Sequence, residues 1–207
     1  MARLTTNAWP TLSRAELVDP VIFVIDMVNG FVKEGALADS AIADIKPEIA
    51  RLLDETDCAN VFVCDAHPPK TREFEAYPPH CVIGTPESEV VDELADRIQR
   101  VIHKNSTNAF MAPEFTQWLD ERLHHYKDIV ITGCCTDLCV LQFALAMQTY
   151  FNEHNMTDKR VIVVADCVDT YNIKDSHPAV FWNEAALANM AANGITVVKN
   201  IEKEKEN

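Results

Sequence analysis

Side chains that could do covalent chemistry follow four apolar runs of the sequence, at or just past the point where each run ends. In chain order they are Asp26, Asp65, His67, Lys104 and Cys139. If these runs are parallel strands of one open sheet, ligands bind beyond their carboxyl ends and the groups meet at one edge. Any one of them alone would be interpreted as a turn, surface or core residue. Their shared location indicates a site in which carboxylate, ammonium, imidazole and thiol groups act together.

Cys139 is the candidate nucleophile. Thr136 and Asp137 are residue types that cap helices, so we expect a helix to begin there, with Cys139 in its first turn. The positive end of a helix lowers the pKa of a thiol and favours the nucleophilic thiolate. Backbone N–H groups of Cys135 and Cys139 could hold the oxyanion of a tetrahedral intermediate. Two alternatives remain open: buried core thiols, or a metal cluster whose spacing lacks the Cys-x-x-Cys pairing of common zinc sites.

A nucleophilic thiol needs a proton acceptor, and no histidine is an obvious partner for this one. Asp26 can serve, because it follows a buried strand and desolvation raises the pKa of a carboxyl group. Lys104 would then offset the carboxylate charge and stabilise the thiolate and the oxyanion. We therefore predict that Asp26, Lys104 and Cys139 act as a catalytic triad.

Residues 65–88 form the longest stretch without clear periodicity, and long loops in compact domains are often functional. This loop contains Asp65, His67, Glu73 and His80 as candidate metal ligands. Imidazoles and carboxylates with positions left for water or substrate are typical of a catalytic Zn²⁺ site, and Fe²⁺ or Mn²⁺ are alternatives. In the competing interpretation, the two histidines only form hydrogen bonds with loop backbone.

Aromatic residues flank the proposed acid and metal residues. We predict that Phe31 and Tyr77 form walls for a flat ring, and that Cys134, in the turn before the nucleophile, also contributes to substrate binding. His103 lies in a predicted strand and Trp182 in a helical pattern, so both are expected in the core.

The sequence as a whole alternates short apolar runs with longer amphipathic stretches. The expected strands are Val21–Ile25, Asn60–Cys64, Arg100–His103, Asp128–Thr132, Arg160–Ala165 and Thr196–Val198. The expected helices are 41–56, 88–98, 113–125, 138–152 and 178–193. Nearly continuous apolar strands are typical of parallel sheets buried on both faces. The pattern predicts an α/β fold, a three-layer α/β/α sandwich with a central, mostly parallel six-stranded sheet.

The length of 207 residues, of which 48% are apolar, is enough for one domain with a full hydrophobic core. We expect a single domain over residues 1–207, with 1–19 as an N-terminal arm and 202–207 as a frayed tail. Trp9 and Leu12 lie outside the sheet pattern, so the arm is a candidate interface between copies of the chain.

The net charge of −14, from 18 basic and 32 acidic residues, argues against nucleic acid and anionic membranes as partners. No segment approaches the roughly 20 apolar residues that span a bilayer, and residues 1–20 lack the pattern of a signal peptide. The expected compartment is the cytoplasm. There the odd number of cysteines, 7, indicates catalytic, ligating or buried thiols and not a disulfide framework.

Three segments, in the right order along the chain, resemble the isochorismatase-like cysteine hydrolases. They are Ile25-Asp-Met-Val-Asn-Gly-Phe31, Lys104 after the third strand, and Gly133-Cys-Cys-Thr-Asp-Leu-Cys-Val140, which is the most specific. The resemblance extends over about residues 20–198. It implies the isochorismatase-like hydrolase fold, the same catalytic triad, and a cis peptide bond between Cys134 and Cys135.

Within that family, the long loop is similar to the metal segment of nicotinamidases. Asp65-Ala-His67 is followed by Pro-Pro-His80-Cys-Val-Ile-Gly-Thr85, and Glu73 stands where some bacterial members place a fourth ligand. In those enzymes the metal ion binds the pyridine nitrogen of the substrate and orients its amide toward the cysteine. The sequence departs from many of them at four positions: Val28, Gly30, Ala66 and Ser88.

The resemblance implies a metal-assisted cysteine amidohydrolase. Its first candidate substrate is nicotinamide, with nicotinate and ammonia as products and a thioester on Cys139 as the intermediate. It also implies a homo-oligomer, a dimer or tetramer, whose other partner is the small-molecule amide. Another amide, a ureide or isochorismate is the alternative substrate, and a non-catalytic relative that binds a ligand or a partner protein is a further alternative.

Overall fold

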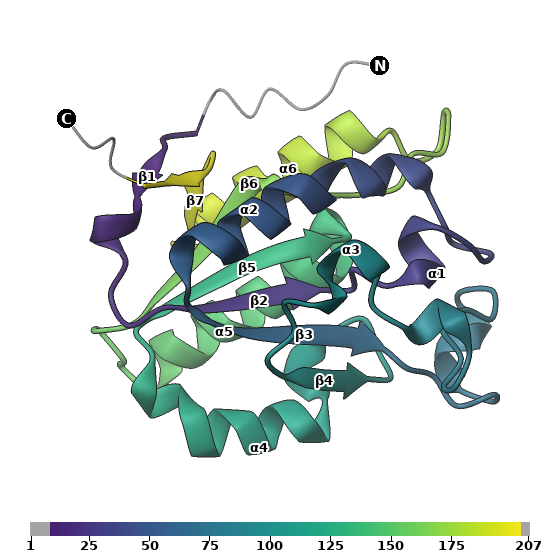
Figure 1. Ribbon diagram of the computed structural model, residues 1–207, viewed down its shortest axis with the longest axis horizontal. Helices are drawn as coiled ribbons and strands as arrows, with labels where there is room; N and C mark the ends of the chain where they lie inside the picture. Colours follow the sequence, from purple (N-terminus) through teal and green to yellow (C-terminus); the bar gives the residue numbers. More distant parts are fainter. Residues whose placement is uncertain (1–8, 204–207) are drawn as a thin grey trace.

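The computed structural model describes residues 9–203 and is built around one six-stranded sheet (Figure 1). Its spatial order is β4-β3-β2-β5-β6-β7, and every neighbouring pair is parallel. The strands are β2 (Val21–Ile25), β3 (Ala59–Asp65), β4 (Val101–Lys104), β5 (Asp128–Cys134), β6 (Arg160–Asp169) and β7 (Thr196–Val198). The six predicted strands are confirmed.

Strand β2 lies inside the sheet, and all five of its residues are buried. Val21, Phe23 and Ile25 belong to the hydrophobic cluster on one face, and Ile22 and Val24 belong to the cluster on the other. Because side chains pack against helices on both faces, the strand has no solvent side and its sequence is continuously apolar. The sheet pattern read from the sequence has this physical origin.

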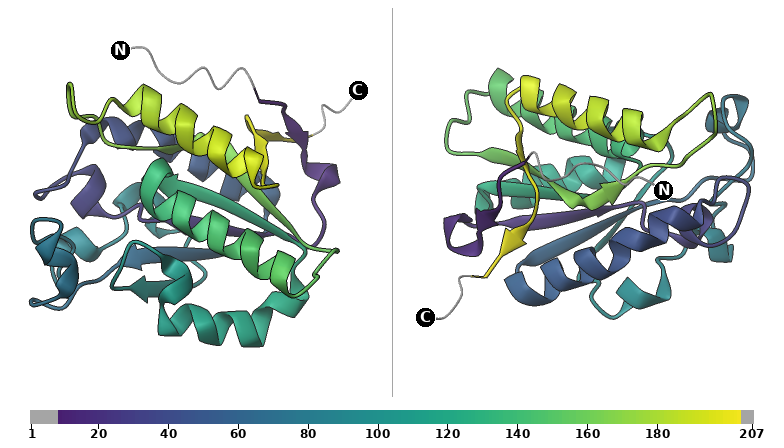
Figure 2. Two further views of the ribbon diagram at one scale, coloured as in Figure 1. Left: turned by 180° about the vertical axis from the view of Figure 1, so that it is seen from behind. Right: turned by 90° about the horizontal axis from the view of Figure 1, so that it is seen from above.

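Helices cover both faces of the sheet, which gives the three predicted layers (Figure 2). The helices are α1 (Asn29–Val32), α2 (Lys46–Thr56), α3 (Asp92–Ala95), α4 (Pro113–Arg122), α5 (Leu141–Glu153) and α6 (Ala179–Ala192). Buried residues of α4, α5 and α6 pack in the cluster of Phe23, and those of α1, α2 and α3 pack in the cluster of Val24. Within residues 9–203, no helix is long and apolar enough to cross a membrane.

Two predicted helices are shorter than expected. The N-terminal part of 41–56 is a 3₁₀ helix, Ser40–Ile45, so that α2 begins only at Lys46. The stretch 88–98 contains only the four-residue helix α3. The backbone before α3 is held elsewhere, because Val90 forms a β-bridge with Val28. A long-range backbone contact of this kind overrides local helical periodicity.

Two residues expected in the core lie at the surface. His103 is in the edge strand β4 and points to solvent, where its Nδ1 is 3.6 Å from Oε1 of Glu114. Trp182, in the first turn of α6, is 37% exposed and stacks on His177. Periodicity identified their elements correctly, but it did not identify the face on which each side chain lies.

The segments outside the main sheet pair with each other. Strand β1 (Leu12–Ser13) lies parallel to β8 (Ile201–Glu202). Leu12 is buried in this pair, and Glu202 belongs to a strand although it was expected in a frayed tail. The described part of the predicted arm therefore pairs with a strand of its own chain. Residues 1–8 of the arm and 204–207 of the tail lie outside the described residues.

Gly133 in β5 makes a close approach that only glycine allows. Its φ is 106°, and a Cβ at this position would overlap the carbonyl oxygen of Ile25 in β2. We predict that Gly133→Ala lowers the free energy of unfolding by about 3 kcal/mol or more, because left-handed strain of ~1–2 kcal/mol adds to overpacking of ~1–3 kcal/mol.

Gly84→Ala is the matched control, since Gly84 has a φ of 78° but no atom lies within 4 Å of its added Cβ. It should carry the backbone strain alone, about 1–2 kcal/mol. Urea denaturation measures both variants. Equal losses would show that the close approach to Ile25 is unimportant.

Candidate active site

The carboxyl ends of β2, β3 and β4 bring the predicted residues together. Asp65 ends β3 and Lys104 ends β4, and the parallel register pairs these two residues directly. Asp26 follows β2 with a left-handed φ of 51°, and its N–H donates to the carbonyl of Val63 at 2.8 Å. Its Oδ1 accepts the N–H of Asp65 at 2.9 Å. Three neighbouring strand ends thus place three charged groups at one edge, as predicted.

Lys104 lies at the centre of this group, with its side chain buried. Its Nζ is 2.8 Å from Oδ2 of Asp26 and 2.6 Å from Oδ1 of Asp65. The same nitrogen is 3.6 Å from Sγ of Cys139. One ammonium therefore contacts both carboxylates and the thiol, and the structure brings the three members of the predicted triad together.

The two carboxyl groups have pKa values displaced in opposite directions. Burial raises the pKa of Asp26 to about 6; repulsion by Asp65 adds to this rise, and Lys104 opposes it. Burial also acts to raise the pKa of Asp65, but Lys104 and the neighbouring histidines outweigh burial and hold it well below its usual range. Burial acts to lower the pKa of Lys104, but the two carboxylates outweigh burial and raise this pKa well above its usual value. The ammonium therefore stays charged. Asp26 is the carboxyl group suited to take and return a proton.

Burial raises the pKa of the Cys139 thiol well above its usual range, which corrects the expectation that a helix end lowers it. Attraction by Lys104 opposes the rise, and Asp26 adds to it. The resting thiol is therefore neutral and needs a base when it attacks. The Cys139 side chain also influences the pKa of Asp26, in the lowering direction, so the thiol lies near the carboxyl group that would serve as its base.

Cys139 lies in a turn of π-helix, Thr136–Val140, that continues into α5. The helical segment begins where predicted, with Cys139 in its first turn. The peptide bond between Cys134 and Cys135 is cis, as the resemblance implied.

Thr136 and Asp137 do not cap this helix, although both are typical capping residues. The N-cap position is occupied by Cys135, without a side-chain cap. The Asp137 carboxylate instead accepts a hydrogen bond from Thr170 Oγ1 at 2.6 Å and lies 2.8 Å from Nε2 of His177. The side chain expected to stabilise the helix end is used to hold a distant loop.

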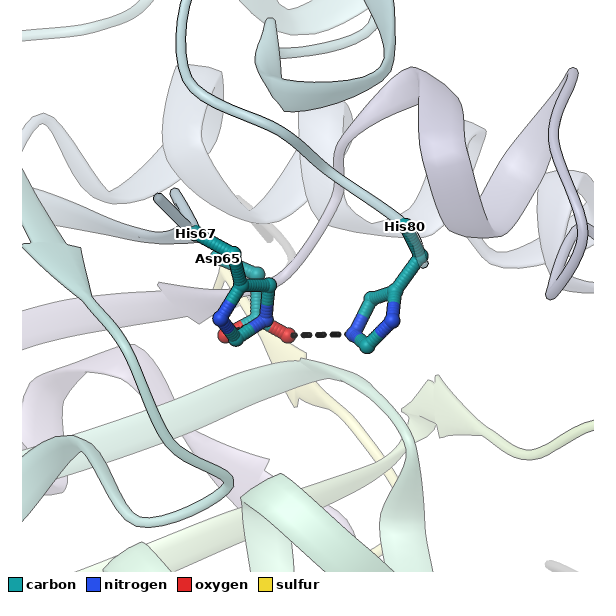
Figure 3. A group of neighbouring side chains, drawn as sticks. All are labelled: Asp65, His67 and His80. Atoms are coloured by element: carbon teal, nitrogen blue, oxygen red, sulfur yellow. Dashed lines mark ion pairs between the residues drawn. The ribbon is translucent and has the colours of Figure 1, made fainter. Parts of the chain in front are cut away.

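Asp65, His67 and His80 form a group that could hold a metal ion. One ligand atom from each lies within 4.8 Å of the others, and all three side chains are buried. Nε2 of His67 is 3.5 Å from Oδ1 of Asp65, and Nε2 of His80 is 3.7 Å from its Oδ2. Figure 3 shows the imidazole of His80 turned toward the Asp65 carboxylate.

The outer nitrogen of each imidazole is held by the protein. Nδ1 of His67 is 2.8 Å from Oδ1 of Asn105, and Nδ1 of His80 is 2.8 Å from the carbonyl oxygen of Pro78. Both partners are acceptors, so Nδ1–H donates outward and Nε2 faces Asp65. Such outer contacts orient the histidine ligands of metal sites.

The chemistry of this group fits a divalent cation. Nε2 of His67 is buried and forms no hydrogen bond with any residue from 9 to 203, which is rare for a buried nitrogen. Burial lowers the pKa of His67, but Asp65 and Asn105 raise it by more. The group therefore attracts positive charge at Nε2, and two imidazoles with one carboxylate are a ligand set that Zn²⁺ accepts.

A cavity of about 320 Å³ opens beside the thiol and the metal group. Cys139, Asp65 and His80 line it, and the aromatic side chains of Phe31 and Tyr77 lie in its wall as predicted. The rest of its wall comes from Glu73, Cys135, Thr107, Leu138 and the segments 36–39 and 171–173. The nucleophile and the metal group therefore face the same space.

Two predicted residues have different positions from the others. Glu73 lines the cavity but lies outside the group of three candidate ligands, so its role as a fourth ligand stays a prediction. Cys134 is fully buried, its thiol lies 3.1 Å from the carbonyl oxygen of Asp26, and it is not in the cavity wall. The next residue, Cys135, reaches the wall, and the predicted role of Cys134 in substrate binding stays a prediction.

Asn105, His177 and the cavity wall at 171–173 were not among the residues predicted from the sequence. Asn105 follows the last residue of β4, so its position beyond a strand was a usable signal. His177 and the wall residues lie in a loop after β6, where no periodicity or motif pointed to the site.

The fold and the site define the class of protein: the chain belongs to the isochorismatase family, whose domain it matches over residues 20–202. It is an isochorismatase-like hydrolase, an enzyme. Among curated proteins it is similar to Nicotinamidase 1 of Arabidopsis thaliana, with 26% identity over 212 residues, 87% of this chain and 85% of the relative.

Solved structures of relatives share the fold. The pyrazinamidase of Pyrococcus horikoshii, in complex with zinc, has 26% identity and a TM-score of 0.69, over 87% of this chain and 99% of that one. PnC1 from L. infantum, in complex with nicotinate, has 21% identity and a TM-score of 0.73, over 91% of this chain and 98% of that one. At the latter identity the likeness concerns the fold alone.

The position of Lys104 makes a prediction for stability. Lys104→Met leaves the buried carboxylates of Asp26 and Asp65 without their shared cation, and we expect the free energy of unfolding to fall by about 3–5 kcal/mol. Lys127→Met is the control, because Lys127 forms an exposed pair with Asp19 at 3.6 Å, and such pairs contribute about 0–1 kcal/mol. Chemical denaturation compares the two; a loss below about 1 kcal/mol for Lys104→Met would contradict the central role of this ammonium.

Proposed function

We propose that the protein is a nicotinamidase, which hydrolyses the carbon–nitrogen bond of nicotinamide to give nicotinate and ammonia. The observation that carries the proposal is the shared cavity: Cys139 lines it together with Asp65 and His80 of the metal group. A flat ring with a carboxamide needs two such recognition elements, one for the ring and one for the amide. The similarity to a curated nicotinamidase supports the same substrate.

The reaction begins with the neutral thiol of Cys139 near the carboxylate of Asp26. As the sulfur attacks the amide carbonyl carbon, its proton passes to the Asp26 carboxylate, whose raised pKa of about 6 suits a general base near neutral pH. Lys104, 3.6 Å from the sulfur, stabilises the negative charge that develops there. The carbonyl oxygen becomes an oxyanion, which the N–H groups of Cys135 and Cys139 receive.

The tetrahedral intermediate then loses ammonia. The proton held by Asp26 passes to the leaving nitrogen, the carbon–nitrogen bond breaks, and a thioester to Cys139 remains. In the second half, Asp26 takes a proton from a water molecule that attacks the thioester carbon. That proton returns to the Cys139 sulfur when the carbon–sulfur bond breaks, so that the thiol is restored and nicotinic acid leaves, which becomes nicotinate by losing its proton to the solvent.

Asp65, His67 and His80 would hold a divalent metal ion, for which Zn²⁺ is the first candidate. When bound, the ion would act as a Lewis acid toward the pyridine nitrogen and so orient the ring. The protein contributes the imidazole orientations, through Asn105 and Pro78, and the aromatic wall of Phe31, whose ring centroid lies 5.5 Å from that of His80. Phe31 thus lies beside the place where the ring would sit.

The proposal is tested by ammonia release from nicotinamide, with purified protein before and after chelation and after addition of Zn²⁺, Mn²⁺ or Fe²⁺. We predict release of one ammonia per nicotinate formed, loss of activity on chelation, and recovery with at least one metal. Cys139→Ala should lower kcat by at least about 1,000-fold. Cys58→Ala, which removes a half-buried thiol away from the site, should leave it unchanged.

Two results would contradict the proposal. If wild-type protein releases no ammonia from nicotinamide with any metal, the substrate is wrong and other amides and ureides become the candidates. If Cys139→Ala retains substantial activity, the thiol is not the nucleophile. If activity survives complete removal of the metal, the metal group has no role in the reaction, whereas the proposed chemistry of the Cys139 thiol is unaffected.

A further inference from the structure

His177 makes contacts that the proposed reaction does not use. Its side chain is 12% exposed, and its Nε2 lies 2.8 Å from Oδ2 of Asp137. Its Nδ1 lies 2.9 Å from the carbonyl oxygen of Tyr171. A carboxylate and a carbonyl oxygen only accept hydrogen bonds, so each ring nitrogen must donate a hydrogen. Only the doubly protonated imidazolium can make both bonds at once.

Two aromatic rings stack on this imidazole. Tyr171 stacks on it with ring centroids 3.9 Å apart and planes 12° from parallel. Trp182 stacks as well, with centroids 5.2 Å apart and planes 8° from parallel. The faces of Tyr and Trp rings attract cations. The carboxylate and the carbonyl group accept from the two ring nitrogens, and the two aromatic rings pack against the imidazole.

Asp137 connects His177 to the nucleophile. It belongs to the π-helical turn Thr136–Val140, which also carries Cys139. Its second oxygen accepts the hydroxyl hydrogen of Thr170 at 2.6 Å. The turn of the nucleophile is thus tied to the loop after β6 by two side chains, of which His177 carries the charge.

Tyr171 connects His177 to the cavity wall. Tyr171, Asn172 and Ile173 line the cavity. Ile173 is also joined to His177 by two backbone hydrogen bonds, with N···O distances of 3.0 and 2.8 Å. The N–H of Asn172, between these two residues, donates to Asp39, another residue of the cavity wall, at 2.9 Å. His177 therefore holds the first and last residues of the wall and attaches them to the turn of Cys139.

We propose that His177, as an imidazolium, is a positioning residue that fixes the wall Tyr171–Ile173 against the turn carrying Cys139 and so sets the affinity for substrate. Its kinetic consequence rests on the proposed amide hydrolysis. The effect should fall on KM and not on kcat. Thr170 continues to hold Asp137 when His177 is replaced, and none of the contacts described for His177 involves Cys139, Asp26 or Lys104.

His177→Gln tests the proposal, because a glutamine amide cannot bridge the carboxylate and the carbonyl group in the same way or carry the charge. We expect KM for nicotinamide, or for the amide that the wild type turns over, to rise about tenfold, with kcat changed less than about threefold. A KM within twofold of the wild type would overturn the proposal. So would a fall in kcat without a rise in KM, since that would place the effect on the chemical step.

His154→Gln is the matched control. His154 also has Nδ1 2.9 Å from a tyrosine carbonyl oxygen, that of Tyr150, and its ring lies on the Tyr150 ring with centroids 4.1 Å apart. It is exposed and away from the cavity lining. The control should leave KM and kcat unchanged, which separates the loss of a histidine–tyrosine contact in general from the loss of this connection.

A second measurement on the wild type needs neither turnover nor a folded variant. Long-range ¹H–¹⁵N correlation NMR of ¹⁵N-histidine-labelled protein distinguishes protonated from unprotonated ring nitrogens, and the His177→Gln spectrum assigns the His177 signals. If that variant does not fold, distance contacts to the Tyr171 and Trp182 rings assign them in the wild type. We expect both nitrogens of His177 to be protonated near neutral pH.

An unprotonated nitrogen on His177 would overturn the proposal even if nicotinamide is hydrolysed. Conversely, if the wild type does not hydrolyse nicotinamide, the proposed substrate is wrong. The NMR measurement would still show whether both nitrogens of His177 are protonated. The two failures are therefore distinguishable.

Discussion

The ammonium of Lys104, buried between the carboxylates of Asp26 and Asp65, is the interaction on which the site depends. An ionised group without a partner costs several kcal/mol in an interior, so each of these charges is stable only because the others are there. The backbone fixes their spacing. The register of β3 and β4 pairs Asp65 with Lys104, and the left-handed turn after β2 directs Asp26 to the N–H of Asp65. No flexible loop is needed to assemble the group.

One shared cation gives the two carboxyl groups different roles. Asp65 is held ionised by Lys104 and by His67 and His80, so it remains the anion of the metal group. For Asp26, burial and repulsion by Asp65 outweigh Lys104, and the resulting pKa of about 6 allows it to exchange a proton with Cys139. Environments that displace two neighbouring carboxyl groups in opposite directions are a common way to assign an anion and a base. Lys104 therefore couples the nucleophile to the metal group while it contacts both.

The residues at strand ends could be predicted from the sequence, because the same buried strands that make the apolar pattern also determine where Asp26, Asp65 and Lys104 lie. The pKa of Cys139 was predicted in the wrong direction. Its helix does begin where expected, but burial, which depends on packing by distant segments, raises the pKa of the thiol, and Asp26 and Asp65 add to the rise. His177 could not be predicted, since its partners Asp137 and Trp182 are brought to it by tertiary structure alone.

The claim that the Cys139 sulfur attacks the amide carbon is tested most directly by trapping the acyl-enzyme. Rapid acid quenching during turnover of nicotinamide, followed by intact-mass spectrometry and peptide mapping, would detect a nicotinoyl group on the chain. The account predicts a transient adduct on Cys139 that disappears as nicotinate accumulates. A nicotinoyl group on a different residue, such as the neighbouring Cys135, would contradict it.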